Sequence, residues 1–299
     1  MDRLRIIEFV PAAVQALARG LGYFEDASVS VETARTRSAP EQRDRLLAGE
    51  FDAGTTAIDN LIAWNADGAD FVLVAQLERT TVLDLVARVG IASLADLAGA
   101  RFAVDSPVTG FSIVLRAMFA RHGIRIDDDQ LVAAGGIGQR FEAIRDGDAD
   151  AGLLGPPWSQ QAAESGLVHL TTVEAEFPDF PGIGLVVRRV QVERVRPVLG
   201  AYLRACSTAA AWACHPTHRG AALGILADAG FPPQGAESIL AVVPCSIEPA
   251  MNGVRLLYEM RRALGRLPAA APGPAALVDG ALLAAAIGES KRVDRANAP

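Results

Sequence analysis

The sequence predicts an α/β protein of two lobes with a ligand cleft between them and a helical C-terminal segment. Three observations lead to this prediction. The chain has 299 residues, about the length at which one hydrophobic core gives way to two. Strand and helix patterns alternate through the first half and recur about a hundred residues later. Helical patterns then fill the region from residue 192 onward.

A repeated motif marks two copies of one structural unit. The pattern Gly-x-x-Asp-Ala-Gly occurs at 49–54 and again at 147–152. In each copy a short apolar strand is followed by a proline, Pro11 or Pro107, which suits the first turn of a helix. Each copy therefore reads as strand, helix, strand, helix and strand. Such alternation predicts a mostly parallel sheet with helices on its faces.

The repeat also predicts where the lobes begin and end. We expect lobe one to comprise residues 1–85 and 188–299, and lobe two to comprise residues 86–187. The alternative is one continuous sheet that arose from a decayed duplication. Two lobes are favoured because ligand pockets occur preferentially at domain interfaces.

Composition narrows the partners and the compartment. The net charge of −7 argues against nucleic acid, which requires a basic surface. The three cysteines show no disulfide framework, and Cys206 and Cys214 are too far apart to pair within one helix. No apolar run reaches the ~18 residues of a membrane-spanning helix. Since no leader is recognisable, we expect a cytoplasmic protein or an exported domain without its leader.

Ligands of open α/β sheets bind beyond the carboxyl ends of the strands. We therefore expect the binding residues in the loops that follow the predicted strands. In lobe one these residues are Phe9, Pro11, Ser38, Thr55, Thr56, Asp59, Asn60 and Gln76. In lobe two they are Ser106, Thr109, Gly110, Phe111, Gly136, Gln139, Pro156 and Trp158.

Several of these residues also have a structural interpretation. Thr56 and Asp59 have the spacing of a capping box, which would make Asp59 structural. Phe9 either stacks on a ligand or caps the core. Ser106 begins a helix whose free N–H groups suit an anion, or it serves as an N-cap alone. Trp158 forms an aromatic wall or fills the base of the lobe.

The charge of the ligand stays open at this stage. Arg37, Arg79 and Arg140 favour an acid, because a guanidinium binds carboxylates and sulfonates well. Asp59 and Asp105 favour an amine or a pyrimidine instead.

No catalytic, cofactor or metal motif is recognisable. The Gly-rich loop at 135–140 lacks the spacing and the lysine of a phosphate-binding loop. His215 and His218 lack the further ligands that zinc requires. There is no Gly-x-Ser-x-Gly or His-Glu-x-x-His sequence. We therefore expect no cofactor, no metal and no catalytic residues.

Several segments resemble the solute-binding proteins of sulfonate/taurine-type ABC importers, whose superfamily also holds the thiamine-pyrimidine synthases. The most specific is Ser-Leu-Ala-Asp-Leu-Ala-Gly-Ala-Arg-Phe-Ala-Val at 93–104, supported by Val-Ser-Val-Glu at 29–32 and Phe-Val-Leu-Val-Ala at 71–75. The resemblance covers about residues 5–185. It implies a type II periplasmic-binding-protein fold whose hinge consists of two crossing segments.

The resemblance also implies a function. We expect a monomeric, periplasmic solute-binding protein that closes on a small polar organic molecule, an organic acid, a sulfonate or a pyrimidine-like compound, and delivers it to an ABC permease. A cytoplasmic location is the alternative to a periplasmic one. The alternative function is an enzyme on the same scaffold, a decarboxylase, a desulfinase or a pyrimidine-processing enzyme. The synthases' Cys-rich motif and active-site His/Lys set are not recognisable, which favours binding over catalysis.

Overall fold

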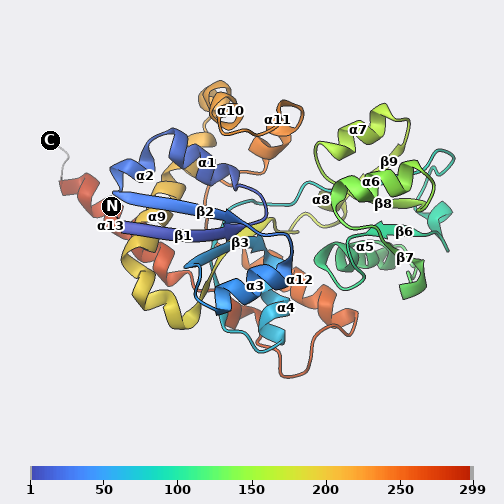
Figure 1. Ribbon diagram of the computed structural model, residues 1–299, viewed down its shortest axis with the longest axis horizontal. Coiled ribbons are helices and arrows are strands. Elements are labelled where there is room, and N and C mark those ends of the chain that lie inside the picture. Colours follow the sequence, from blue (N-terminus) through green and yellow to red (C-terminus); the bar gives the residue numbers. More distant parts are fainter. Residues whose placement is uncertain (1, 297–299) are drawn as a thin grey trace.

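The computed structural model describes residues 2–296 and shows two lobes (Figure 1). The beginning of the chain, in blue, and its last third, in yellow to red, form one lobe, and the middle of the chain, in green, forms the other. This confirms the predicted two-lobed α/β fold with a helical C-terminal segment. The alternative of one continuous sheet is wrong, because the strands within the described residues belong to two separate sheets.

The sheet of lobe one has a parallel part and an antiparallel part. Its strands, in spatial order, are β2 (Val29–Arg35), β1 (Asp2–Glu8), β3 (Ala53–Ala57), β10 (Ile183–Arg188) and β4 (Phe71–Gln76). Strands β2, β1 and β3 are parallel, and β10 is antiparallel to both of its neighbours. Glu8 pairs with Arg35 on one side and Thr55 on the other. The carboxyl ends of three strands therefore meet at one edge.

The sheet of lobe two repeats this arrangement. Its strands, in spatial order, are β7 (Leu131–Ala133), β6 (Phe102–Val104), β8 (Ala151–Leu154), β5 (Asp84–Ala87) and β9 (Val168–Thr172). Strands β7, β6 and β8 are parallel, and β5 is antiparallel to β8 and β9. Strands β6, β7 and β8 thus correspond to β1, β2 and β3, as the repeated motif indicates.

The expected lobe boundaries differ from the strand pairing. A boundary after residue 85 cuts β5, whose residues all pair within the second sheet. A boundary after residue 187 cuts β10, which pairs within the first sheet. The chain instead crosses between the sheets at 77–83 and 177–182. Short apolar strands look alike in sequence, so the sheet they join is decided by tertiary packing.

Helices cover both faces of each sheet. In lobe one they are α1 (Ala13–Gly20), α2 (Tyr23–Asp26), α9 (Val192–Ala213), α10 (Arg219–Asp228), α11 (Pro233–Ala241) and α13 (Ala281–Ala296) on one face, and α3 (Ala39–Leu47), α4 (Ile58–Ala66) and α12 (Met251–Ala263) on the other. In lobe two they are α5 (Gly110–Arg121), α6 (Ile137–Arg145), α7 (Trp158–Glu164) and α8 (Val173–Glu176). Short 3-10 turns lie at Ala95–Leu97, Asp128–Gln130, Arg189–Gln191, Pro216–His218 and Pro274–Leu277. Among residues 2–296, no helix combines the length and the apolar character needed to cross a membrane.

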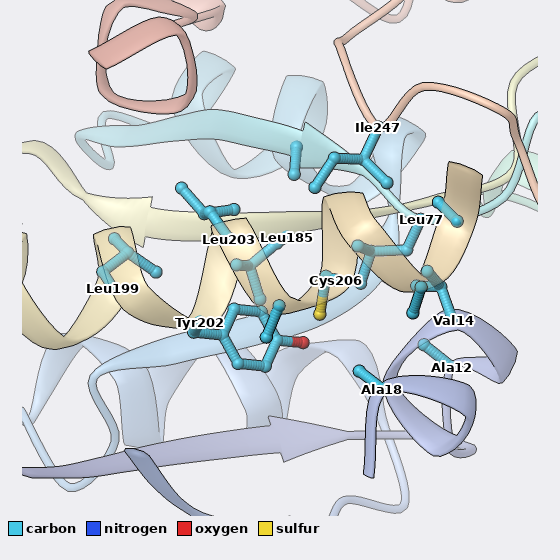
Figure 2. Packing of buried hydrophobic residues seen from close by; sticks show 14 of the residues in the cluster. Ala12, Val14, Ala18, Leu77, Leu185, Leu199, Tyr202, Leu203, Cys206 and Ile247 are labelled. Carbon is cyan, nitrogen blue, oxygen red and sulfur yellow. The ribbon is translucent and has the colours of Figure 1, made fainter. Parts of the chain in front are cut away.

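The long helix α9 forms the centre of the first core. Figure 2 shows Tyr202 and Leu203 of α9 packed beside Leu185 of β10. Leu77 and Ile247, which lie outside regular elements, complete the same cluster. A second apolar cluster contains residues of α4, α12 and α5. Helix α12 therefore packs against both lobes on one side of the molecule.

Cys214 and Cys245 form a disulfide that the cysteine pattern did not predict. They lie 31 residues apart in sequence, with Cα atoms separated by 5.4 Å. The expectation that no disulfide framework exists is therefore wrong for this pair. The reason is that Cys214 directly follows α9 whereas Cys245 lies in the irregular segment between α11 and α12, so that only tertiary packing brings them together. Cys206 is a free, buried thiol.

Candidate functional site between the lobes

The two lobes contact each other at two places beside their strand-end loops. Gly110, at the start of α5, lies against Asp59 in the first turn of α4, and a Cβ built on Gly110 would lie 2.8 Å from the Oδ2 atom of Asp59. Gly235 of α11 lies against Pro156, whose Cβ would be 3.1 Å from a Cβ on the glycine. The absence of a side chain at 110 and 235 permits this approach. The strand-end loops of both sheets therefore border one interlobe region.

Large apolar side chains are exposed in the first strand-end loop of each lobe. Phe9 is 37 % exposed, Val10 58 % and Val108 55 %. Phe9 was predicted as a site residue, whereas Val10 and Val108 were missed. Val10 directly precedes Pro11 and Val108 directly follows Pro107, and this place in a strand-end loop is a signal that could have identified them. Exposed apolar groups at the end of a sheet offer contact area to the organic part of a ligand.

A buried carboxyl group lies at the same edge of the first sheet. Glu8 is almost fully buried, and burial raises its pKa to about 7, although Arg35, Arg19 and Gln15 act in the opposite direction. Its Oε2 atom and the Oγ1 atom of Thr55 have no hydrogen-bond partner within the described chain. Sequence reasoning missed Glu8, although its alternation with the buried Leu4 and Ile6 was a readable signal.

Glu8 belongs to a buried polar network behind this edge. Gln15 hydrogen-bonds Glu8 and accepts a hydrogen bond of 2.9 Å from the Tyr202 hydroxyl group. That hydroxyl group also contacts the Cys206 thiol (Figure 2). Burial raises the pKa of Cys206 to about 12 and raises the pKa of Tyr202 as well. Both groups are therefore neutral at physiological pH.

Several predicted ligand contacts of lobe one are engaged within the protein. Gln76 donates hydrogen bonds to the Glu78 and Arg79 carbonyl groups and accepts one from the Ala250 amide. Asn60 donates to the Thr56 hydroxyl oxygen over 2.9 Å. These side chains hold loops in place, which leaves them fewer free hydrogen-bonding groups for a ligand. Ser38 caps α3 by accepting a hydrogen bond from the backbone amide of residue 41.

Asp59 is neutralised by an arginine from the C-terminal segment. Arg261 of α12 donates two hydrogen bonds of 2.6 Å to the two carboxylate oxygens of Asp59. The side chains are only 7 % and 4 % exposed. The alternative capping box with Thr56 does not form, because α4 begins after Ala57 with no side-chain cap within the described chain. Asp59 thus belongs to a buried ion pair beside the interlobe region.

The predicted polar residues of lobe two are also partly engaged. Thr109 donates a hydrogen bond of 2.5 Å to Asp105, and the side chain of Gln139 accepts one from the Gly136 amide. Ser106, Gly110, Phe111 and Pro156 are half-buried, whereas Gly136 and Gln139 are exposed. Trp158 packs on Phe141 with ring centroids 5.6 Å apart, so that its ring fills space between α6 and α7.

One buried positive charge at the edge of the second sheet has no ion-pair partner within the described residues. Arg140 of α6 is 1 % exposed, donates a hydrogen bond of 2.8 Å to the Leu153 carbonyl group and lies 4.6 Å from the ring centroid of Phe111. Its Nε atom has no partner, and no carboxylate within the described residues forms an ion pair with it. Burial lowers its pKa, and Asp105 partly offsets this. A buried cation without a counter-ion favours a nearby anion.

Two cavities lie away from these loops. One of about 710 Å³ lies between the end of α5 and the end of α12. The other, of about 400 Å³, lies beside the Cys214–Cys245 disulfide. The first is lined by none of the residues considered for the ligand and the second only by Arg79, so the candidate site rests on the facing strand ends.

One protein-family model matches most of this two-lobed chain. Residues 3–227 match the model of the NMT1-like family. The chain belongs to the NMT1-like family. No curated protein matches its sequence significantly. The family match covers both sheets of this NMT1-like chain and most of α10.

Solved structures share the fold of the NMT1-like chain over nearly its whole length. The alkanesulfonate-binding protein SsuA of Xanthomonas axonopodis, bound to MOPS, is 20 % identical with a TM-score of 0.75, over 93 % of this chain and 98 % of that one. The periplasmic nitrate-binding protein NrtA of Synechocystis PCC 6803 is 16 % identical with a TM-score of 0.80, over 97 % and 89 %. A Candida albicans protein with the generic periplasmic binding protein fold is 14 % identical with a TM-score of 0.74, over 94 % and 97 %. These likenesses establish the periplasmic-binding-protein fold.

Proposed function

We propose that this NMT1-like protein is the solute-binding component of an ABC-type importer and that it captures a small organic anion between its lobes. The observation that carries the proposal is the pair of facing strand-end loops on lobes joined by two crossing segments. The neighbours include an alkanesulfonate-binding protein, a periplasmic nitrate-binding protein and the ligand-binding component of an ABC-type import system from Staphylococcus aureus. Their descriptions support the same role for this chain.

The mechanism follows from the connection between the lobes. Residues 77–83 and 177–182 join two separately packed sheets, so that bending at these segments moves one lobe relative to the other. A ligand that touches both lobes binds the closed arrangement more tightly than the open one. It therefore shifts the population toward closure, and a permease then recognises the closed form.

The charged side chains near the interlobe region favour an anionic ligand. The sequence alone left the charge of the ligand open. Asp59 is neutralised by Arg261, and Arg79 pairs with Glu174, so that neither sets the charge of the site. Arg140, at the edge of lobe two, forms no ion pair within the described residues, although the negative charge of Asp105 acts on it and offsets part of its charge. In a water-poor interior such a charge acts over several ångströms, so an anion near the loop at 105–111 is stabilised without direct contact. We therefore favour a sulfonate or a carboxylate over an amine.

The cysteines support binding in an exported protein. A disulfide between Cys214 and Cys245 persists in oxidising compartments such as the periplasm. The remaining thiol of Cys206 is buried, and its raised pKa disfavours the thiolate needed for nucleophilic attack. Within the described residues the cysteines therefore offer no nucleophile for the enzyme alternative. We propose a periplasmic monomer that delivers its ligand to an ABC permease.

A ligand screen with matched variants tests the proposal. Isothermal titration with aliphatic sulfonates, short carboxylates, nitrate and pyrimidine amines should show binding of at least one acid. Phe9→Ala and Val108→Ala should each weaken that binding about tenfold or more. Leu47→Ala and Val190→Ala remove exposed apolar side chains away from the strand ends and should leave affinity unchanged. Equal losses in all four variants, or binding of amines alone, would contradict the proposal.

A further inference from the structure

A strap of chain lies alongside the first crossing segment. Residues 242–250 join α11 to α12 without regular secondary structure, and we call them the strap. The Gln76 amide donates a hydrogen bond of 2.8 Å to the Ile247 carbonyl group of the strap. The Arg79 amide donates one of 2.8 Å to the Val242 carbonyl group. The strap thus holds the backbone at both ends of residues 76–79.

Side chains strengthen this attachment. Gln76 is buried, and its Oε1 atom accepts a hydrogen bond of 3.0 Å from the Ala250 amide. The Nε atom of Arg79 donates a hydrogen bond of 3.2 Å to the Ala241 carbonyl group, directly before the strap. Ile247 and Leu77 belong to the same apolar cluster (Figure 2). The backbone of residues 76–79 is therefore held by lobe one, while the Arg79 side chain also pairs with Glu174 of lobe two.

The strap also leads to the second crossing segment. Gly253, two residues into α12, lies so close to that segment that a Cβ would be 2.8 Å from the Asp179 carbonyl oxygen and 2.9 Å from Pro181. The crossing segments touch each other as well, because Gly182 lies against Glu78 and Thr80. The strap and the start of α12 thus contact both connections between the lobes.

The disulfide anchors the strap to the core of lobe one. Cys245 of the strap is bonded to Cys214, which directly follows α9. Helix α9 packs against α1 and α13, and Leu199 and Tyr202 within it are fully buried. The strap is therefore joined covalently to the end of the helix that forms the centre of the first core.

We infer that the Cys214–Cys245 disulfide positions the hinge: through the strap it ties residues 76–79 to lobe one and confines bending of the first crossing segment to the residues after Arg79. Leu83 already accepts a hydrogen bond from the Val173 amide of lobe two. Residues 80–82 therefore lie between the part of the segment that is held by lobe one and the part that is held by lobe two. The ligand-binding role of this hinge rests on the proposed function, whereas the mechanical linkage does not.

Amide hydrogen exchange tests the linkage without any ligand. In the double variant Cys214→Ser/Cys245→Ser, the amides of Gln76 and Arg79 should exchange about tenfold faster than in the unaltered protein. Amides of β6 and β8 in lobe two should keep their rates. Cys206→Ser is the matched control, because it removes the buried thiol of the same lobe and leaves the disulfide intact. It should leave the Gln76 and Arg79 rates unchanged.

A second variant separates the strap from the stability of the whole lobe. Gln76→Met keeps a side chain of similar length but removes the bonds to Ala250, Glu78 and Arg79, and it should accelerate exchange at Arg79 with the disulfide intact. Unchanged exchange at both amides in the double variant would overturn the inference. Equal acceleration throughout both lobes would overturn it too, since the disulfide would then stabilise the fold generally. Neither outcome bears on ligand binding, which the screen above tests separately.

Discussion

Removing Arg261 should destabilise the protein through Asp59. Arg261→Met leaves a carboxylate that is 4 % exposed without its partner and without the two hydrogen bonds of 2.6 Å. Breaking a buried pair in this way costs about 3–5 kcal/mol. With an unfolding entropy of about 2.1 cal/mol/K per residue over the whole chain, the melting temperature should fall by about 5–8 °C.

Urea unfolding and thermal melting at pH 7 measure this loss, and a double variant provides the control. Asp59→Leu with Arg261→Met removes both charges together, so that most of the lost free energy of unfolding should return. The result that would refute this reasoning is a stable Asp59→Ala variant that no longer binds ligand. Asp59 would then contact the ligand, as one reading of the sequence predicts, and the ion pair would contribute little.

The remaining predictions concern a buried carboxyl group, the disulfide and the interlobe contact. Because burial raises the pKa of Glu8 from 4.5 to about 7, the folded chain retains a proton that the unfolded chain has released between these values. The free energy of unfolding should therefore fall by about 3 kcal/mol as pH rises through this window. Glu8→Gln should remove the contribution of Glu8 to the pH dependence of the free energy of unfolding, measured by urea titration at several pH values. The contribution of Glu78, whose pKa is raised in the same direction, should remain. An unchanged pH dependence would argue against the burial of Glu8. Loss of the disulfide, as in the double serine variant, should lower the free energy of unfolding of lobe one by roughly 3.5 kcal/mol in urea, as a closed loop of this length implies, and wild-type stability of that lobe would refute it. A thiol reagent should label Cys206 in denaturant and leave it unlabelled in the native protein, where labelling would contradict its burial. Gly110→Ala should push the lobes apart and raise the radius of gyration in small-angle scattering, since a Cβ would lie 2.8 Å from Asp59; an identical curve would count against this contact.

The repeated unit of each lobe was predictable because its signals are local. Strand alternation, the prolines before the helices and the recurring Gly-x-x-Asp-Ala-Gly pattern all lie within a few residues of the elements that they predict. The prediction that Pro11 and Pro107 lie in the first helical turn is wrong, because both precede the N-cap residues Ala12 and Thr109. Glu8 was readable in the same way, since it alternates with Leu4 and Ile6 on the buried face of β1. The sheet joined by β5 or β10 was not readable, because it depends on pairing with strands far away in the sequence.

The roles of the polar site residues depended on distant partners. Asp59 and Gln76 look like free polar groups in their own loops. Arg261 lies 202 residues after Asp59, and the Ala250 amide lies 174 residues after Gln76. Nothing local to either loop indicates these bonds. Strand-end position therefore predicted which loops border the interlobe region, and tertiary packing decided which side chains remain free.

The most direct test of ligand capture between the lobes is a distance measurement across them. Spin labels attached at Leu47→Cys and Val89→Cys, exposed residues of lobe one and lobe two, report the interlobe distance by pulsed electron resonance. The native Cys206 thiol is buried, so the label should react at the two introduced cysteines. An acid found in the ligand screen should shift the distance distribution to a different, narrower one, whereas an uncharged analogue of that acid should not. An unchanged distribution at saturating acid would contradict closure around the ligand.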